Sequence, residues 1–272
     1  MSMEPQHANH DEILATGQPG QLISSDGVAI AYTHWHGDAR QATVVLQHGF
    51  AASTRTNWEA TGVVAGLLAR GLSVVSIDAR GHGLSDKPHD DSHYGEPRMA
   101  RDVIELLDHL QLEQADLFGY SMGAVVALLV ASSGIRMRRL IIGGVGEGVL
   151  ACGGVDTRAV SSEQIVDALL ATDPATIRHP GVAGFREFAE RSGNDLRALA
   201  AQARRMHQSP IALERITAPT LVVAGADDVL AAHADRLAAA IPGARWRQVP
   251  GDHLGAVRQP ALLEAVLDFL EG

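Results

Sequence analysis

One stretch of ten residues decides how this chain folds: Leu117-Phe118-Gly119-Tyr120-Ser121-Met122-Gly123-Ala124-Val125-Val126. The apolar run that ends at Phe118 has the length of a buried strand, and residues 124–131 are typical of a buried helix. Ser121 therefore lies at a sharp turn from strand to helix. Such a turn crowds the chain on both sides, and the positions two before and two after Ser121 are glycines, Gly119 and Gly123. We interpret Ser121 as a nucleophile at the N-terminus of a helix, where the helix dipole favours negative charge.

A serine hydroxyl is a weak nucleophile on its own, so this interpretation requires a base and an acid elsewhere in the chain. The same Gly-x-Ser-x-Gly pattern also fits a plain strand-turn-helix connection with an incidental serine. The other motifs of the chain distinguish between these two interpretations.

Strands and helices alternate along most of the chain. We expect a hairpin from residues 21–24 and 28–33, buried strands at 43–47, 72–77, 115–120, 139–142, 220–224 and 245–249, and helices at 58–70, 98–110, 121–131, 231–240 and 260–270. This alternation predicts an α/β fold with a mostly parallel sheet, right-handed crossovers and helices on both faces.

The alternation stops after the sixth expected strand. Only helical patches follow, at residues 162–171, 182–191 and 195–207. We therefore predict a small helical cap over residues 146–210, inserted into a core domain formed by residues 21–145 and 211–272. Residues 1–20 are polar and lack the apolar centre of a signal peptide, so we expect a flexible tail on a cytoplasmic protein.

Composition limits the partners of the protein. The formal net charge is -10, and none of the 22 basic residues forms a long run, so we expect neither nucleic acid nor a membrane as a partner. Cys152 is the only cysteine, which excludes an intrachain disulfide. Neither a nucleotide-binding glycine motif nor a helical histidine pair is present, so we expect no cofactor and no metal. The expected partner is therefore a small-molecule substrate, and the expected oligomeric state is a monomer or a homodimer.

The candidate base and acid follow two later strands. His253 ends the segment Pro250-Gly251-Asp252-His253, and Asp228 ends the segment Gly225-Ala226-Asp227-Asp228. Because open parallel sheets bind ligands at the carboxyl ends of their strands, both segments are expected beside Ser121. His253 would accept the serine proton while Asp228 orients the ring. Asp227 is the less favoured acid because it more naturally caps the turn, and Asp252 would have to fold back.

Two further segments follow strands at the same edge. His48-Gly49-Phe50 follows the strand that ends at Gln47, and we expect the Phe50 and Met122 N–H groups to form an oxyanion hole. A simple strand-to-loop turn is the alternative for this segment. In the segment 78–86, polar residues are expected to form a hydrogen-bonded supporting loop: Arg80, His82, Ser85 and Asp86.

Taken together, these segments resemble a Ser-nucleophile member of the α/β-hydrolase fold superfamily over residues 21–272. The motifs that carry the resemblance are His48-Gly49-Phe50, Asp78-x-Arg80-Gly81-His82-Gly83-x-Ser85-Asp86, Gly119-x-Ser121-Met122-Gly123, Gly225-x-x-Asp228 and Gly251-Asp252-His253. The resemblance implies eight strands with an antiparallel start, a helical cap after the sixth strand, and no cofactor. It also implies Ser121, Asp228 and His253 as the catalytic triad, with Phe50 and Met122 as oxyanion donors. Relatives that cleave halides or epoxides place Asp at the nucleophile position, so the serine here disfavours those activities.

The subgroup of this superfamily that the chain resembles contains esterases, lactonases, cofactor-free perhydrolases and C–C bond hydrolases. We expect hydrolysis of carboxylic esters with short to medium acyl chains. The residues expected to line the acyl pocket are Phe50, Val149, Leu150, Phe185, Phe188 and Met206.

Three alternatives remain open. The first is a C–C hydrolase of ring-cleavage diketones, with Arg186, Arg191 or Arg204 near a substrate carboxylate. The second is a ligand-sensing receptor on the same fold with very slow turnover. The third concerns the triad alone, where Glu147 would replace Asp228 as the acid.

Overall fold

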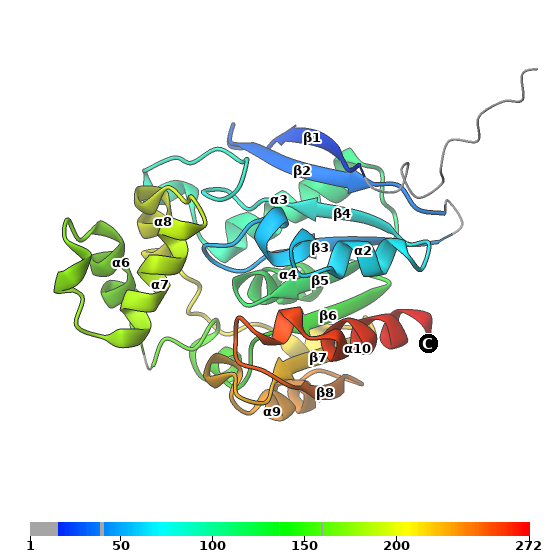
Figure 1. Ribbon diagram of the computed structural model, residues 1–272. Helices are drawn as coiled ribbons and strands as arrows, with labels where there is room; N and C mark the ends of the chain where they lie inside the picture. Colours follow the sequence, from blue (N-terminus) through cyan, green and yellow to red (C-terminus); the bar gives the residue numbers. More distant parts are fainter. Residues whose placement is uncertain (1–15, 39–40, 136, 159) are drawn as a thin grey trace, which may run out of the picture.

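The computed structural model describes residues 16–38, 41–135, 137–158 and 160–272. An eight-stranded sheet with the order β1-β2-β4-β3-β5-β6-β7-β8 runs through its centre (Figure 1). The strands are β1 Gln18–Ile23, β2 Ala29–Trp35, β3 Thr43–Gln47, β4 Ser73–Ile77, β5 Ala115–Tyr120, β6 Arg139–Gly143, β7 Thr220–Gly225 and β8 Arg245–Val249. Strand β2 pairs antiparallel with β1 and β4, and the other neighbours are parallel. The predicted mostly parallel sheet with an antiparallel start is confirmed.

The composition of each strand fits its place in the sheet. The inner strands β5 and β7 are buried at every residue, as expected for parallel strands covered on both faces. The edge strand β8 is exposed at Arg245, Trp246, Arg247 and Gln248. Its charged side chains discourage pairing with another strand at this edge.

Helices cover both faces of the sheet. They are α2 Val63–Leu68, α3 Glu96–His109, α4 Met122–Ser132, α5 Gly148–Cys152, α6 Ser162–Leu170, α7 Pro180–Arg191, α8 Leu196–Ala203, α9 Ala234–Ala240 and α10 Pro260–Glu271. Residues of α3, α4 and α9 form one apolar core with the sheet, and residues of α2 and α10 form the other (Figure 1). None of the helices in the described ranges has the length and hydropathy needed to cross a lipid bilayer.

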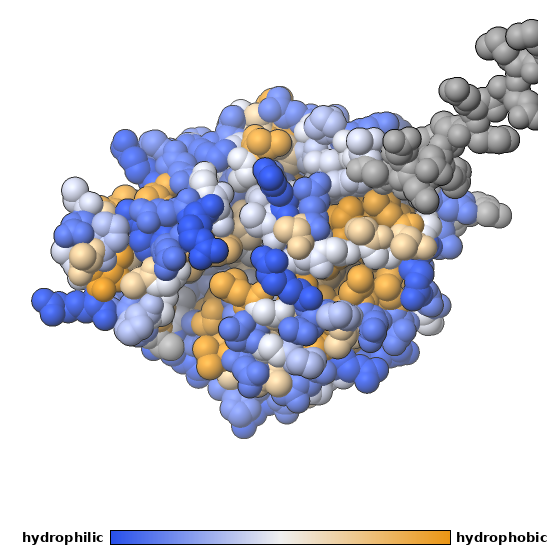
Figure 2. Space-filling view, viewed as in Figure 1, coloured by the Kyte–Doolittle hydropathy of each residue, from blue (hydrophilic) through white to orange (hydrophobic). Residues whose placement is uncertain are grey.

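Helices α6, α7 and α8 form a lobe at the carboxyl ends of the strands (Figure 1), which we call the cap. The cap has an apolar cluster of its own, made by Val166, Leu169, Ala189, Leu199, Ala200 and Ala203 together with Ala51 of the core. Asn194, between α7 and α8, donates its amide hydrogen to the Ala51 carbonyl at 2.7 Å. Figure 2 shows that the outer surface of the cap is largely hydrophilic on the face in view.

The N-terminal boundary of the core differs from the prediction. Strand β1 begins at Gln18, inside the region expected to be a tail, because β2 continues to Trp35 and its residue His34 pairs with Gln18. Residues 1–15 of the expected tail lie outside the described residues.

Several helices also differ from the prediction, among them the one expected at residues 195–207, which ends at Ala203. The helix expected at residues 58–70 is divided into a π-helical turn, Thr54–Glu59, and α2, because Gly62 adopts a positive φ of 81° between them. The helix expected at residues 231–240 begins only at Ala234, since His233 has a positive φ of 53°. The short helix α5 was not predicted, because five residues are too few to show a helical period.

Candidate active site

Ser121 occupies the turn between β5 and α4 in a strained conformation. Its φ of 55° and ψ of -118° lie in a region that residues with a side chain rarely adopt. Its N–H donates to the Gly143 carbonyl of β6 at 2.8 Å, and its own carbonyl accepts from the Ala124 and Val125 N–H groups. These bonds on both sides of Ser121 hold the strained turn in place.

The two glycines of the motif allow this turn to approach its neighbours closely. A Cβ on Gly119 would lie 2.0 Å from the Gly123 carbonyl oxygen. A Cβ on Gly123 would lie 2.0 Å from the Gln47 carbonyl oxygen at the end of β3. The crowding expected from the sequence is therefore present at both positions, and any side chain there would displace backbone.

The structure brings the predicted nucleophile, base and acid together. His253 Nε2 lies 3.0 Å from Ser121 Oγ, and His253 Nδ1 lies 3.0 and 2.9 Å from the two Asp228 carboxylate oxygens. A carboxylate accepts hydrogen bonds, so Nδ1 carries the proton and Nε2 is free to accept the serine hydrogen. Asp228 and Ser121 are only 5% and 7% exposed, which reduces competition from water for these contacts.

Of the candidate acids near His253, only Asp228 contacts its ring among the described residues. The Asp228 carboxylate also accepts from the Leu230 and Ala231 N–H groups, which fixes its orientation. Asp227 is exposed, and the Asp252 carboxylate turns back to accept from the Gly255 N–H group.

Glu147 lies elsewhere, in contact with Arg236 at 2.7 Å and Arg158 at 3.3 Å. It does not take the place of Asp228 at the His253 ring in this structure.

The described part of the chain has no group of three or more His, Cys, Asp or Glu residues arranged to hold a metal ion.

Tyr120, immediately before Ser121, holds the backbone of the candidate base. Its hydroxyl donates to the His253 carbonyl at 2.8 Å, and the two ring centroids are 5.6 Å apart. Burial raises the pKa of the Tyr120 phenol, and the charges of Asp228 and Asp252 raise it further, so the phenol remains a hydrogen donor. The sequence analysis missed this residue, although its position next to the nucleophile was the signal that could have revealed it.

His48 and Asn57 shape the loop after β3. The Ala79 N–H group donates to His48 Nε2 at 3.0 Å, so Nδ1 carries the ring proton and donates to the Gly49 carbonyl at 2.8 Å. Burial lowers the pKa of His48, which favours this neutral form. Asn57 Oδ1 accepts from the Gly49 N–H group at 3.1 Å. Nothing in the sequence indicated the role of Asn57.

The loop after β3 lies directly beside the nucleophile. A Cβ on Gly49 would lie 3.3 Å from the Ser121 Cβ. Within the described ranges, the N–H groups of Phe50 and Met122 have no hydrogen-bond acceptor. Both predicted oxyanion donors are therefore free to bind a ligand.

The segment after β4 supports these turns. The Asp78 carboxylate accepts from the Thr54 and Leu84 N–H groups at 2.7 and 2.8 Å, and Ser85 Oγ donates to the Asp78 carbonyl. Burial, together with the nearby His48, lowers the pKa of His82 to about 3, so His82 is neutral. Other polar contacts of the segment join it to the hairpin and α3: Asp86 to Ala29, and Arg80 to Asp26 and Asp102.

The six residues predicted to line an acyl pocket do not all lie together. Four of them pack against the apolar cluster of the cap: Phe50, Phe185, Phe188 and Met206. The Phe50 and Phe185 rings are stacked, with centroids 5.2 Å apart and planes inclined by 4°. Val149 instead belongs to the main core and Leu150 is 46% exposed, because consecutive residues of the short helix α5 point in directions about 100° apart.

Arg186 has a structural role in the cap. Its guanidinium donates to three carbonyl groups at the C-terminal end of α6 and pairs with Glu190. Arg191 is exposed and pairs with Glu187 at 3.7 Å. Both arginines are therefore already paired. Arg204, the third candidate, is exposed at the C-terminal end of α8 and has no ion-pair partner among the described residues.

The parallel sheet, the strained serine turn and the free N–H groups beside it define a class of protein. The chain belongs to the alpha/beta hydrolase family, whose sequence profile matches residues 44–266.

Among individual proteins, the chain is similar to 3-oxoadipate enol-lactonase 2 of Acinetobacter baylyi, with 29% identity over 69% of this chain and 74% of the lactonase. It is also similar to a putative 2-succinyl-6-hydroxy-2,4-cyclohexadiene-1-carboxylate synthase of Bacillus subtilis, with 29% identity over 55% of this chain and 53% of that protein. A hydrolase structure from Pseudomonas aeruginosa PA01 superimposes with a TM-score of 0.73 and 30% identity over 93% of this chain and 98% of that structure. The chain spans about half or less of the length of the first curated relatives it matches.

Proposed function

We propose that this protein hydrolyses carboxylic esters through an acyl intermediate on Ser121. The observation that best supports the proposal is the 3.0 Å contact between Ser121 Oγ and His253 Nε2, with Asp228 on the other side of the ring. This order of groups activates a hydroxyl at neutral pH, because the imidazole removes the serine proton as the hydroxyl attacks. The similarity to a lactonase fits the same class of reaction, because a lactone is a cyclic ester.

In the first half of the reaction, Ser121 Oγ attacks the ester carbonyl carbon and its proton moves to His253 Nε2. The carbonyl oxygen becomes an oxyanion, which the Phe50 and Met122 N–H groups stabilise. The C–O bond to the leaving group then breaks, and His253 gives its proton to the departing alcohol. Asp228 stays ionised and stabilises the imidazolium that forms between these two steps.

In the second half, a water molecule replaces the alcohol. His253 Nε2 removes one proton from this water as its oxygen attacks the acyl carbon. The second tetrahedral intermediate uses the same two N–H groups. Its collapse returns the proton to Ser121 Oγ and releases the carboxylic acid.

The positions and contacts of the cap arginines favour ester hydrolysis over C–C bond hydrolysis. A ring-cleavage product carries a carboxylate that has to be paired in a buried site. Arg186 already donates to carbonyl groups of α6, Arg191 is paired at the surface, and Arg204 is exposed at the C-terminal end of α8. A neutral ester has no carboxylate and therefore needs no arginine partner in the site.

The stack of Phe50 on Phe185 favours short to medium acyl chains, because it fills apolar space between the cap and the loop that carries Phe50. The test is a series of p-nitrophenyl esters from acetate to palmitate, with intact-mass detection of the acyl-enzyme. We expect the highest kcat/KM for short or medium chains and a mass increase equal to the acyl group. Fastest turnover on palmitate would contradict the predicted size.

Ser121→Ala should abolish the acyl-enzyme and lower kcat by about 10⁴-fold or more. Ser133→Ala is the matched control, because Ser133 is exposed and its Oγ only donates to the Val130 carbonyl. Equal acylation of both variants would place the nucleophile elsewhere. A folded wild type that binds ligands but shows no multiple turnover on any ester would favour the receptor alternative.

A further inference from the structure

Gln202 lies on the cap helix α8 and is completely buried, with 0% of its surface exposed. The buried residues around it on the helix are alanine and leucine: Ala198, Leu199, Ala200, Ala201 and Ala203. A buried amide without hydrogen-bond partners would destabilise the fold. The partners of Gln202 therefore indicate why a polar side chain occupies this position.

Both ends of the Gln202 amide contact the core of the protein. Its Oε1 accepts from the Gly95 N–H group at 3.0 Å, and its Nε2 donates to the Met122 sulfur at 3.8 Å. Because an N–H group only donates, the Gly95 contact determines which end of the amide faces Met122. The cap is thereby joined to the first residue of α4, directly after Ser121.

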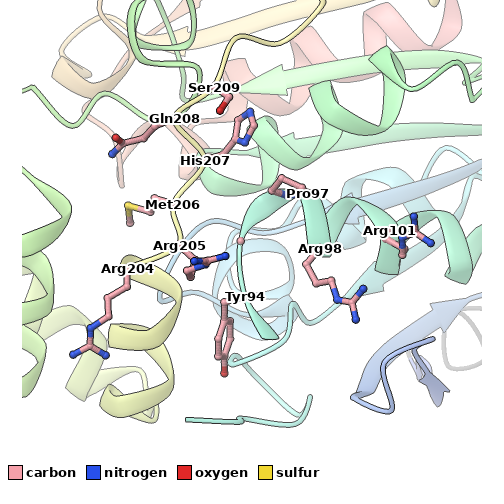
Figure 3. Close-up of a pocket in the computed structure, with 11 residues that line it drawn as sticks. Tyr94, Pro97, Arg98, Arg101, Arg204, Arg205, Met206, His207, Gln208 and Ser209 are labelled. Atoms are coloured by element: carbon pink, nitrogen blue, oxygen red, sulfur yellow. The ribbon is translucent and has the colours of Figure 1, made fainter. Parts of the chain in front are cut away.

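The backbone that follows Gln202 is also held against the core. The segment 204–209 leaves α8 and passes the start of α3 near Pro97 (Figure 3). There the His207 N–H group donates to the buried Glu96 carboxylate at 2.7 Å. A Cβ on Gly95 would lie 3.1 Å from the Arg205 carbonyl oxygen, so the two segments are in close contact. Any shift of α8 relative to α3 would break these contacts.

The polar contacts between cap and core are concentrated on α8 and its flanks. At its N-terminal end, Asn194 donates to the Ala51 carbonyl and Asp195 pairs with His89 at 2.8 Å. Among the residues that the structure describes, neither α6 nor α7 makes a hydrogen bond or an ion pair with the core. Helix α8 is therefore fixed to the core at both ends, and Gln202 extends this connection to the serine turn.

We propose that Gln202 is a positioning residue that holds Met122, and with it the Met122 N–H group, in place for the oxyanion. A thioether is flexible and a weak acceptor, so without the amide the Met122 side chain is free to take other rotamers. Met122 is only 2% exposed, and in a closely packed interior a new rotamer displaces the adjoining backbone. The inference rests on the proposed function, because this N–H group acts on the tetrahedral intermediates.

Gln202→Leu should lower kcat by about tenfold and leave KM within about twofold of the wild type, because the oxyanion forms only after the substrate is bound. Gln164→Leu is the matched control, since it makes the same change on cap helix α6, where the exposed Gln164 bonds only to Ser161. Steady-state kinetics on the best p-nitrophenyl ester measures both variants, and thermal unfolding checks that they are folded. Equal kcat values for the two variants would overturn the inference.

Met122→Leu distinguishes positioning from a general effect on the fold. Leucine conserves the volume and the backbone N–H group but removes the sulfur that Gln202 contacts. In the Met122→Leu background, Gln202→Leu should therefore lower kcat by no more than about threefold. A loss of about tenfold in both backgrounds would show that Gln202 acts without Met122, and the inference would be wrong.

Labelling of Ser121 with a fluorophosphonate tests the inference without an ester. Ser121 Oγ bonds to phosphorus, fluoride leaves, and the serine proton goes to His253, while the two N–H groups face the phosphonyl oxygen. Intact-mass measurements should show labelling about tenfold slower in Gln202→Leu than in Gln164→Leu. A wild type that is labelled but hydrolyses no ester refutes the proposed function, and this difference in labelling still supports Gln202. Equal labelling of the two variants, or no labelling of the wild type, would overturn the inference.

Discussion

The hydroxyl of Tyr120 donates a 2.8 Å hydrogen bond to the carbonyl oxygen of His253, although the two residues are 133 positions apart in the sequence. This bond joins the end of β5 to the loop after β8. It fixes the backbone of the candidate base from the residue that precedes the candidate nucleophile. The placement of His253 therefore depends on a side chain that takes no direct part in proton transfer.

Tyr120→Phe should lower kcat by roughly tenfold with little change in KM, because loss of one buried hydrogen bond costs about 1 kcal/mol and loosens the ring of His253. Steady-state kinetics on the best p-nitrophenyl ester measures this change. Tyr32→Phe is the control, because the Tyr32 hydroxyl makes a long, exposed contact of 3.4 Å with His109 Nε2. Identical kcat values for the two variants would show that the Tyr120 bond does not position His253.

Asp228→Asn should lower kcat by about 10²-fold to 10⁴-fold, because an amide neither stabilises the imidazolium nor fixes the required tautomer. The neighbouring Asp227→Asn removes the same charge one residue earlier at an exposed position, and its activity should stay within about twofold of the wild type. Circular dichroism should show both variants folded. A larger loss in the Asp227 variant would reverse the assignment of the acid.

Glu96 should make the protein less stable as the pH rises. Burial raises the pKa of this carboxyl from 4.5 to about 7, against the opposing effect of hydrogen bonds that include the His207 N–H group. Between these two values the folded state binds more protons than the unfolded state, so the free energy of unfolding falls as pH increases from about 4.5 to about 7.

The size of this fall is up to about 3 kcal/mol, and it should disappear in Glu96→Gln, which stays neutral. Urea unfolding of the wild type and the variant at several pH values separates this effect from the histidines, which both proteins share. If the difference in stability between the two proteins is the same at about pH 5 and pH 8, Glu96 does not titrate as described.

Two glycine substitutions should have opposite effects on stability. Gly184→Ala should stabilise the protein by about 0.5–1 kcal/mol, because Gly184 is inside α7 and a Cβ there meets nothing within 4 Å. Gly123→Ala should destabilise it by several kcal/mol, since a Cβ there meets the Gln47 carbonyl oxygen at 2.0 Å. Thermal unfolding measures both. A destabilised Gly184 variant would mean that α7 does not tolerate alanine at this position.

The sequence was most informative where a local pattern controls the structure. The buried runs predicted the strands, and Gly119 and Gly123 predicted the crowded turn, because each constraint acts within a few residues. The positions of Asp228 and His253 followed from one rule about the carboxyl ends of parallel strands. The observed sheet agrees with the predicted strands.

The missed features depend on residues that are distant in the sequence or on single backbone angles. The break before α2 results from the φ of Gly62, and the late start of α9 results from the φ of His233. Asn57 and Gln202 act through contacts that no spacing rule predicts. The two sides of α5 could not be assigned either, so Val149 and Leu150 were grouped with a pocket that they do not share.

The hydrogen bond from Asn194 to the Ala51 carbonyl has a consequence for recombination between relatives. Ala51 directly follows Phe50, so an amide from the cap anchors the loop that carries a candidate oxyanion donor. A chimaera that received residues 146–210 from another hydrolase without an amide at this position would leave that carbonyl unpaired. The cap and the loop after β3 are therefore best exchanged together, as one module.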